Sequence, residues 1–568
     1  RDEPSLVCQE VTVTVDGEVD LSLKAIVDGR HVDGRPLRYM RDTPGEEKPA
    51  CDGVVLWESA GALSTCGIAY TTELIGAEAK PDKPSLENRT LTTSYAFRAE
   101  AGLPYRLRHI ASLIPRVTHL QPDFEAVRQV AKARKRGFEA IRAANRSIWA
   151  DAWKSRINLI GADARWQALA DAAQFYLISS THVASPPSTS IFGLATWHDC
   201  HYYYGHVMWD IETFVVPVLS LLQPHAAESL LNYRTRHLSG AASNARLRGR
   251  RGLQFPWESA PSSGQEAAPM PGSASWHEDH VSLDVARAFA FHADVTGQLE
   301  FLREDAWPVL SGVANWITSR VTKSARGYEI HATMGIAERE QEADNAAFTN
   351  MAAVAVLRDA IRAAERLGRA ADREWARIAD AMVLPKAGDV IVSHDGFEPG
   401  EEKGGTPDPL MGVFPLGFDM DPQVEAATLK FYLDRRKDYI GSPMLSALYG
   451  VWAAYSGDRG LSARLLDDGY GRFCVGRFLQ TLEYREEVFP EQPRAGPFFA
   501  NLGGFLMGLL MGFPGLRPGP GEPENWMRRA VVLPEGWSSI EVERVWIRGR
   551  PFKLMARQGA KRAELTTA

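Results

Sequence analysis

The chain has 568 residues, a formal net charge of −7 and 24% charged residues, values typical of a globular protein with two to four domains. Its basic runs are short, "KARKRG" at 132–137 and "RLRGRRG" at 246–252, whereas a nucleic-acid-binding protein carries a broader basic surface. No run of 18 apolar residues occurs, so the sequence predicts no membrane-spanning helix.

The N-terminal region alternates apolar and polar residues. In residues 5–28, "LVCQEVTVTVDGEVDLSLKAIVDG", valine, threonine and leucine recur at every second position around Asp16-Gly17, which predicts a hairpin. Similar segments continue to about residue 118, and we expect an antiparallel β-sandwich over residues 1–120. Because the first strand-like segment begins close to residue 1, we expect further strands upstream of it.

Helical periodicity follows the sandwich. Residues 121–160 read as a helical linker with acidic residues near its start. Over 161–520, ten or more helical segments alternate with loops rich in Pro, Gly, Ser, Trp and acids. This favours an α/α-barrel whose loops gather at one end; a solenoid would also repeat helices, but no fixed-period repeat is found. Residues 521–568 predict a small C-terminal β-sheet.

Four loop regions combine acids, aromatic rings and turn residues: 201–214, 253–266, 335–350 and 483–505. In the first, Asp210 and Glu212 lie among apolar neighbours, and burying a carboxylate without a partner is unfavourable. Either acid could cap a helix or pair with an arginine. We expect sugar hydroxyls beside Trp209 to bind Asp210, and Glu212 to orient the loop or pair with an arginine.

Regions three and four contain acids suited to cleaving a glycosidic bond. That reaction needs one carboxyl group that protonates the leaving oxygen and a second that activates water or attacks the sugar. Glu338 and Glu491 are the candidates, and Glu487 is the reserve for Glu491. Taken singly, Glu338 could belong to a solvated loop and Glu491 to a surface turn. Their joint occurrence in a helical-barrel pattern makes the sugar hypothesis the stronger one.

Four colinear segments carry a family resemblance. "GHVMWDIETF" (205–214), "LQFPWESA" (253–260), "HVSLDVA" (280–286) and "GIAEREQEADNAAFTN" (335–350) resemble blocks of glycoside hydrolase family 65. That family includes trehalose, maltose and kojibiose phosphorylases, acid trehalases and hydrolases of α-1,2-linked glucose. The similarity extends from the sandwich through the barrel to the terminal sheet. It implies an (α/α)6 barrel and a small carbohydrate substrate.

The resemblance also implies residue roles. Glu338 falls on the family's general acid, and Trp209 with Asp210 on the pair that holds the glucosyl ring in subsite −1. Lys403 and Asp408 resemble a Lys and an Asp of a further block, although their spacing is two residues longer and an intervening Gln is absent. Other substrate-binding positions fall in the matched segments: Trp257, Glu258 and His280.

The segment before "FFANLGGF" separates hydrolases from phosphorylases. A phosphorylase needs a cationic or hydroxyl-rich phosphate pocket there, and a carboxylate would repel phosphate. Glu491 therefore predicts an exo-acting, inverting α-glucoside hydrolase, with Glu491 as general base. Arg494 keeps a phosphorylase possible. The sequence is also compatible with a barrel enzyme for another sugar, such as a rhamnoside or a uronic-acid-containing glycan, and with a carbohydrate-binding protein that has a degenerate site.

We expect neither a cofactor nor a metal. The five cysteines form no CxxC pair, which argues against a zinc or redox motif. A set of histidines could suggest a ligand cluster, but in a sugar cleft we expect them to hydrogen-bond hydroxyls: His198, His201, His206 and His280. The family resemblance further implies that the protein could form a homodimer.

Overall fold

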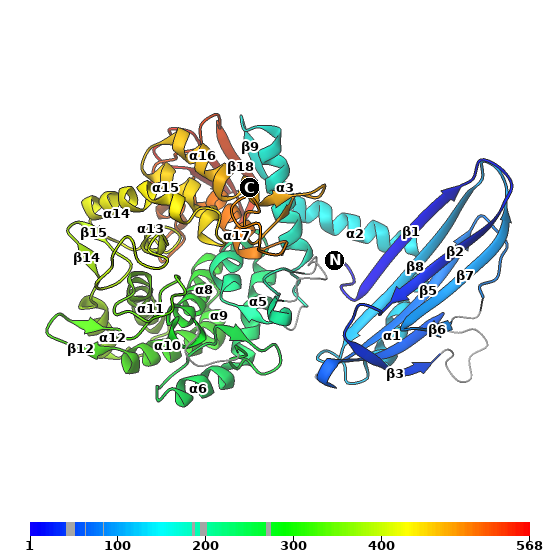
Figure 1. Cartoon of the computed structure of the whole chain (residues 1–568), viewed down its shortest axis with the longest axis horizontal. Coiled ribbons are helices and arrows are strands. Elements are labelled where there is room, and N and C mark those ends of the chain that lie inside the picture. Colours follow the sequence, from blue (N-terminus) through cyan, green and yellow to red (C-terminus); the bar gives the residue numbers. More distant parts are fainter. Residues whose placement is uncertain are drawn as a thin grey trace. The chain divides into compact units, whose positions relative to one another are not determined.

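The computed structural model describes the whole chain except residues 41–50, 63, 83–84, 185–187, 194–201, 269–273 and 568. The chain divides into two units, Arg1–Asp151 and Ala152–Ala568, whose elements are labelled in Figure 1. Among the described helices, none is both long enough and apolar enough to cross a membrane.

The first unit contains two antiparallel sheets. One has five strands in the order β1-β8-β5-β4-β3, and the other has three in the order β2-β7-β6. Buried and exposed side chains alternate along β7, as expected for a strand with one face in the core. The strands are β1 (Leu6–Thr14), β2 (Val19–Asp28), β3 (Gly34–Met40), β4 (Gly53–Ser59), β5 (Thr65–Ile75), β6 (Ser85–Glu87), β7 (Thr90–Ala99) and β8 (Pro104–Pro115).

The hairpin predicted over residues 5–28 is wrong. β1 pairs with β8, and β2 pairs with β7 in the other sheet. The turn at Asp16-Gly17 therefore connects two sheets rather than two paired strands. Period-two alternation predicts a strand and its buried face, but it does not specify the partner.

Two helices complete this unit, α1 (Pro122–Arg136) and α2 (Phe138–Ala152). α1 packs on the five-stranded sheet, where its Ala126 and Val130 join one apolar cluster with residues of that sheet. A Cβ atom on Gly67 of β5 would lie 2.1 Å from the backbone of Pro122. Only glycine therefore allows the start of α1 to approach the strand this closely.

The second unit is built around mostly buried helices. Helices that are apolar on every side belong in the interior of a large protein. Among them, α4 packs on α8, α8 on α11, α11 on α13, and α17 on α4. We call the following set the inner helices: α4 (Val216–Leu222), α8 (His280–Thr296), α11 (Ala347–Arg366), α13 (Asp408–Val413), α15 (Tyr449–Tyr455) and α17 (Phe499–Met507).

Helices with one exposed face pack around the inner set. The helical segment at residues 224–247 is divided into two helices at His237, which has φ −114° and ψ 24°. The short helix α13 was not predicted as a helix. The surrounding helices are α3 (Ala164–Ser179), α5 (Pro224–Arg236), α6 (Leu238–Leu247), α10 (Trp307–Arg320), α12 (Arg373–Asp380), α14 (Pro422–Asp434) and α16 (Arg459–Gly469), with the shorter α7 (Ala274–His277) and α9 (Leu299–Phe301).

The C-terminal sheet has the strand order β20-β19-β18-β9. Its edge strand β9 (Ile157–Ile160) comes from the segment predicted as a helical linker, and Leu159 pairs with Ile540 of β18. The sheet therefore combines strands from the beginning and from the end of the second unit. The other three strands are β18 (Ser539–Ile547), β19 (Arg550–Arg557) and β20 (Glu564–Thr567).

Within the described residues, four two-stranded sheets lie in the loops between helices. One of them, β10 (Val207–Met208) with β11 (Glu258–Ser259), pairs Met208 with Glu258. It thereby joins the first two candidate loop regions. The others are β12 (Thr322–Lys323) with β13 (Tyr328–Glu329), β14 (Lys386–Ala387) with β15 (Val390–Ile391), and β16 (Cys474–Val475) with β17 (Gln480–Thr481).

Candidate active site

Most of the chemically interesting side chains lie at or before the N-terminal ends of inner helices. His280 and Asp408 are the first residues of α8 and α13. Asp210 precedes the helical turn Ile211–Val215 that leads into α4. Helix N-termini carry partial positive charge. An end of the helical unit where several of them gather can therefore hold several carboxylates.

Asp210 is a buried carboxylate with an unfilled hydrogen-bonding position. Its Oδ1 atom has no hydrogen-bond partner among the described residues. Burial raises the pKa of Asp210 to about 7, and the negative charges of Glu212, Glu278 and Glu338 add to that rise. A buried polar atom left unpaired is unfavourable, so the site is suited to a ligand that donates a hydrogen bond to Asp210.

Glu212 has a protein partner. Its two carboxylate oxygens accept hydrogen bonds from Arg234 Nε at 2.7 Å and Nη2 at 2.9 Å, and both side chains are buried. The predicted pairing of Glu212 with an arginine is confirmed. Glu212 thus anchors the loop, whereas Asp210 remains available to a ligand.

A buried triad of Glu278, His280 and Asp284 lies beside Trp209. His280 Nδ1 is 2.7 Å from Asp284 Oδ2, and His280 Nε2 is 3.3 Å from Glu278 Oε2. Burial alone would lower the pKa of His280, but its bonds to Asp284 and Glu278 raise it to about 10. Burial raises the pKa of Glu278 to about 7 against the effect of His280.

Glu278 also has a free acceptor. Its Oε1 atom accepts no well-formed hydrogen bond from the described residues. Glu278 was not singled out from the sequence. It stands two residues before the matched "HVSLDVA" segment, and an acid at that position, preceded by Trp276, was the available signal.

The side chain of Glu338 is exposed, but its negative charge acts on several less exposed carboxyl groups. It raises the pKa values of Asp210, Glu278 and Glu483. It also contributes to the raised pKa of Tyr439, which is held mainly by burial. Glu338 therefore lies at the open edge of a group of buried carboxyls.

Glu483 is the acid that sequence reasoning missed. Its side chain is half-buried, and burial raises its pKa to about 8, with further contributions from Asp210 and Glu338. It follows Leu482, which is buried, directly after strand β17. An acid at the end of an apolar run was the signal that could have identified it.

Glu491 and Glu487, the predicted base and its reserve, are surface acids. Both are exposed, and neither is among the charges that raise the pKa of Glu483. Glu487 lies 3.5 Å from Arg485 Nε, and Arg494 bonds to Glu486 at the surface. The prolines on either side of Glu491-Gln492 favour an exposed turn, and the assignment of Glu491 as general base stays a prediction.

The second loop region mainly supports the first. Glu258 Oε1 lies 2.5 Å from His206 Nδ1, and the Trp257 ring packs edge-on against Tyr203 with 5.9 Å between ring centroids. Trp209 is buried, with its ring 4.8 Å from that of His280. Glu258 already has a protein partner, and Trp209 is a wall behind the site rather than an exposed platform.

The pair Lys403 and Asp408 separates in the structure. Asp408 is buried, accepts a hydrogen bond from the Ser393 hydroxyl at 2.6 Å, and has its pKa raised to about 6 by burial. Its charge and that of Glu338 both act on Tyr439. Lys403 is exposed. The structure thus brings Asp408, but not Lys403, to the carboxylate cluster.

The histidines show no ligand set. His198 and His201 lie outside the described residues, while His206 and His280 contact carboxylates. Within the described chain, no three metal-binding side chains are grouped so as to hold an ion. The candidate site is instead made of carboxyl groups in different environments. Acid–base cleavage of a glycosidic bond uses two carboxyl groups whose environments differ in this way.

Comparison with known proteins supports this view of the site. Residues 198–403 match the model of the glycosyl hydrolase family 65 central catalytic domain. A kojibiose hydrolase from Flavobacterium johnsoniae is 29% identical over 494 residues, which cover 86% of this chain and 70% of that protein. A protein-glucosylgalactosylhydroxylysine glucosidase from Danio rerio is 29% identical over 394 residues, covering 66% and 58%.

A solved structure shows the same fold. It comes from a protein of the human microbiome assigned as a kojibiose phosphorylase, and it superposes with a TM-score of 0.74 at 15% identity, covering 97% of this chain and 76% of that one. The likeness extends over the antiparallel sheets as well as the helices. The chain is therefore a glycoside hydrolase enzyme whose central region, residues 198–403, matches the catalytic domain of glycosyl hydrolase family 65.

Proposed function

We propose that the protein is an exo-acting, inverting α-glucoside hydrolase that releases glucose from the end of an α-linked disaccharide or glycoside. Kojibiose hydrolases from Flavobacterium johnsoniae and Mucilaginibacter mallensis are among its relatives, which favours an α-1,2-linked substrate. One observation carries the proposal: Glu338 and Glu483 are two carboxyls at different depths whose charges interact.

In the proposed reaction, the exposed Glu338 and the less exposed Glu483 have different roles. Glu338, at the open edge, lies where a leaving group can depart, and we assign it the protonation of the glycosidic oxygen. Glu483, which is half-buried and interacts electrostatically with Asp210, activates water on the opposite face of the sugar. An inverting enzyme needs about 6.5–9.5 Å between its two carboxyl groups to accommodate that water.

The glucosyl ring is held by the unfilled acceptors. Asp210 Oδ1 and Glu278 Oε1 lack protein partners, and sugar hydroxyls are donors that complete such sites. We assign Asp408 the same role at the start of α13. The His280–Asp284 pair fixes the position of Glu278, since His280 contacts both acids.

Glu483 holds its proton more tightly than an ordinary carboxyl group does. With its pKa near 8, Glu483 is mostly protonated at neutral pH in the absence of substrate. The reactive form instead carries the proton on Glu338 and leaves Glu483 ionised. The reactive form is then a minority of the free enzyme, because Glu483 must be ionised to activate water.

A phosphorylase on the same fold is the second candidate. The sequence left it open through Arg494, but that side chain pairs with Glu486 at the surface. A buried carboxyl at position 483 would repel a phosphate that attacked the sugar. We therefore favour water as the nucleophile.

The decisive experiment combines three variants with two kinds of substrate. Glu338→Gln should lower kcat on kojibiose by about 10²–10⁴-fold but retain more activity on an α-glucoside with a nitrophenolate leaving group, which needs little protonation. Glu483→Gln should lose activity on both. Azide should partly restore Glu483→Ala and give a β-glucosyl azide.

The matched control is Glu491→Gln, in which a nearby exposed acid is changed. It should keep near-normal activity, and wild type should release β-glucose first, as followed by NMR, without a requirement for phosphate. A phosphate requirement would establish the phosphorylase. If Glu491→Gln is inactive while Glu483→Gln is active, the base is wrongly assigned.

Three structural proposals accompany the activity. We infer that the inner and surrounding helices form an (α/α)6 barrel, since α4, α8, α11 and α13 pack in sequence and α17 packs on α4. The fourfold division at residues 120, 160 and 520 stays a prediction. A homodimer is also proposed, and sedimentation of the purified chain would test it.

A further inference from the structure

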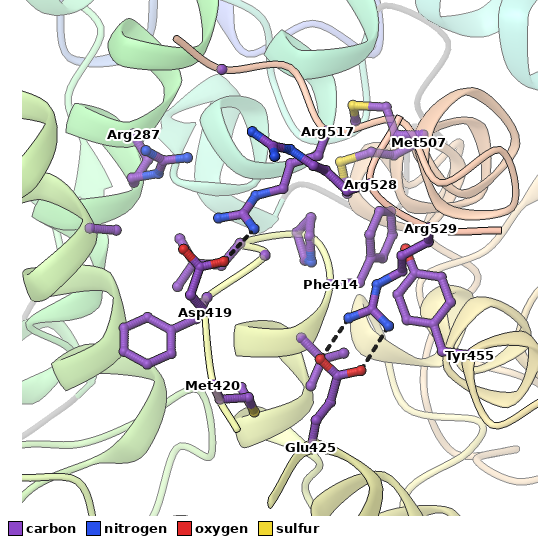
Figure 2. A pocket seen from close by; sticks show the side chains of 18 of the residues that line it. Arg287, Phe414, Asp419, Met420, Glu425, Tyr455, Met507, Arg517, Arg528 and Arg529 are labelled. Carbon is purple, nitrogen blue, oxygen red and sulfur yellow. Dashed lines mark hydrogen bonds and ion pairs between the residues drawn. The ribbon is translucent and has the colours of Figure 1, made fainter. Parts of the chain in front are cut away.

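A cavity with a volume of about 1130 Å³ lies farther along the inner helices (Figure 2). Its lining includes residues of α8 and α11, the C-terminal ends of α13, α15 and α17, helix α14, and the loops at 414–420 and 515–520. Arg287 stands seven residues after His280 on α8, which is about 10 Å along a helix. Asp284, the partner of His280, belongs to the inner wall of this cavity.

Six arginines line this cavity, and Arg529 is paired with Glu425. Four of the six act on one another, and we call them the arginine cluster: Arg287, Arg358, Arg362 and Arg517. Burial lowers the pKa of Arg362, and the positive charges of Arg287, Arg358 and Arg517 lower it further. The four guanidinium groups are therefore within electrostatic reach of one another. Like charges so close together are unfavourable unless anions compensate them.

The compensation within the described chain is incomplete. Arg287 and Arg362 share the single carboxylate of Asp359. Arg517 Nη1 bonds to Asp419 Oδ1 at 2.9 Å, as drawn in Figure 2. Arg358 is exposed on α11 and has no ion-pair partner among the described residues. The cluster therefore has four cations for two directly bonded carboxylates.

Nearby acids are already engaged with other cations. Asp294 bonds to Arg366 at 3.1 Å, and Glu212 is held by Arg234. Cations near a helix C-terminus also complement the helix dipole, but Arg366 already occupies the last turn of α11. The dipole alone does not require four further guanidinium groups around one cavity.

We propose that this cavity binds a small multivalent oxyanion, such as a sugar phosphate or a polycarboxylate. Guanidinium groups bind oxyanions through paired N–H donors. Phe348, Tyr455 and Met507 supply apolar wall beside the charged groups, which suits the carbon skeleton of an organic anion. The site is separate from the carboxylate cluster, which would repel such a ligand.

Calorimetric titration of the full chain at constant ionic strength tests the proposal. The probes are inorganic phosphate, glucose 6-phosphate and citrate, which distinguish a phosphate from a carboxylate ligand. At least one should bind wild type, and Arg358→Gln should weaken that binding at least about tenfold. Arg358→Lys should keep part of the affinity because it keeps the charge.

The matched control is Arg303→Gln, which removes an exposed arginine outside the cavity and should leave binding unchanged. Arg517→Gln provides a second test on a different segment. The proposal is overturned if no probe binds wild type more tightly than chloride does, or if both cluster variants bind as wild type does. Displacement of phosphate or citrate by saturating glucose would place the anion in the sugar site and would also overturn it.

Discussion

The inner helices carry opposite charges toward their two ends. Carboxylates gather around their N-terminal ends, whereas the arginine cluster lines the cavity formed by their later turns. Helix dipoles favour this arrangement at both ends. The two ends differ in burial: Asp210 is only 2% exposed, whereas Arg358 and Arg517 are exposed.

That difference separates two ways in which like charges are tolerated. The acidic end keeps its carboxyls buried and raises their pKa values, so that protons relieve the repulsion. The basic end cannot do this, because an arginine stays charged, and it depends on solvent, partial pairing or a bound anion. Changes at the acidic end should therefore have the larger effects.

The largest loss of stability should follow from breaking the buried ion pair between Arg234 and Glu212. Arg234→Ala leaves Glu212 charged and without its partner, which should lower the free energy of unfolding by about 3–5 kcal/mol. Urea denaturation of the variant and of wild type measures this. Arg236→Ala, at the exposed end of the same helix, is the control and should change little. An Arg234→Ala variant as stable as wild type would show that Glu212 finds another partner.

The next effect is on sugar binding. Asp210→Asn preserves shape but removes the charged acceptor, and one hydrogen bond to a charged group is worth about 1.5–3 kcal/mol, so kcat/KM should fall by about 10–150-fold. Because the Asp210 charge raises the pKa of Glu483, that pKa should also fall, and a pH–activity profile should shift toward lower pH. Asp419→Asn, at the basic end, should change neither quantity.

The residues behind these predictions show what the sequence could reveal. Asp210 among apolar neighbours identified a buried acid that needs a ligand, and Glu212 was expected to pair with an arginine. Both inferences used local context, because the cost of burying a carboxylate is a local property. The same context failed at region four. Glu483 and Glu491 stand eight residues apart in one acid-rich loop, and which of them turns inward depends on tertiary packing.

The fold shows the same division between local and long-range information. Helices and strands followed from periodicity, yet the partners of β1 and β2 did not, and β9 joined a sheet formed mainly by residues 539–567. Pairing across hundreds of residues leaves no local signal. The arginine cluster is a similar case, since Arg287, Arg358 and Arg517 come from three distant segments and look like ordinary surface charges in the sequence.

Stability should also depend on pH at the acidic end. Burial holds the pKa values of Asp210 and Glu278 near 7 and that of Glu483 near 8, above the values of about 4 expected in the unfolded chain. The folded protein then binds more protons than the unfolded chain between about pH 4 and 8, so stability falls as pH rises through that window. His280 acts in the same direction between about pH 6.5 and 10.

Glu483→Gln isolates one contribution to that slope. The variant should unfold at a higher temperature than wild type at about pH 8, by an amount equivalent to about 1–3 kcal/mol, and the difference should shrink toward about pH 5. Calorimetry at the two pH values measures it, with Glu491→Gln as the exposed control. A wild-type melting temperature that rises steadily from about pH 5 to 8 would contradict the raised pKa values.

The smallest expected effect is on stability, and it comes from a change in the arginine cluster. Without a bound anion, Arg358→Gln removes one of four repelling guanidinium groups, just as Glu483→Gln removes one of several repelling carboxyls. The gain should be only a few tenths of a kcal/mol, because Arg358 is exposed and water screens its charge. It should vanish in about 1 M salt, where charges more than about 3 Å apart are screened, and Arg303→Gln should show no gain in either buffer. If Arg358→Gln is less stable than wild type at low salt, then Arg358 already has a stabilising partner. Its charge would then be compensated without a ligand, which contradicts the proposed anion site.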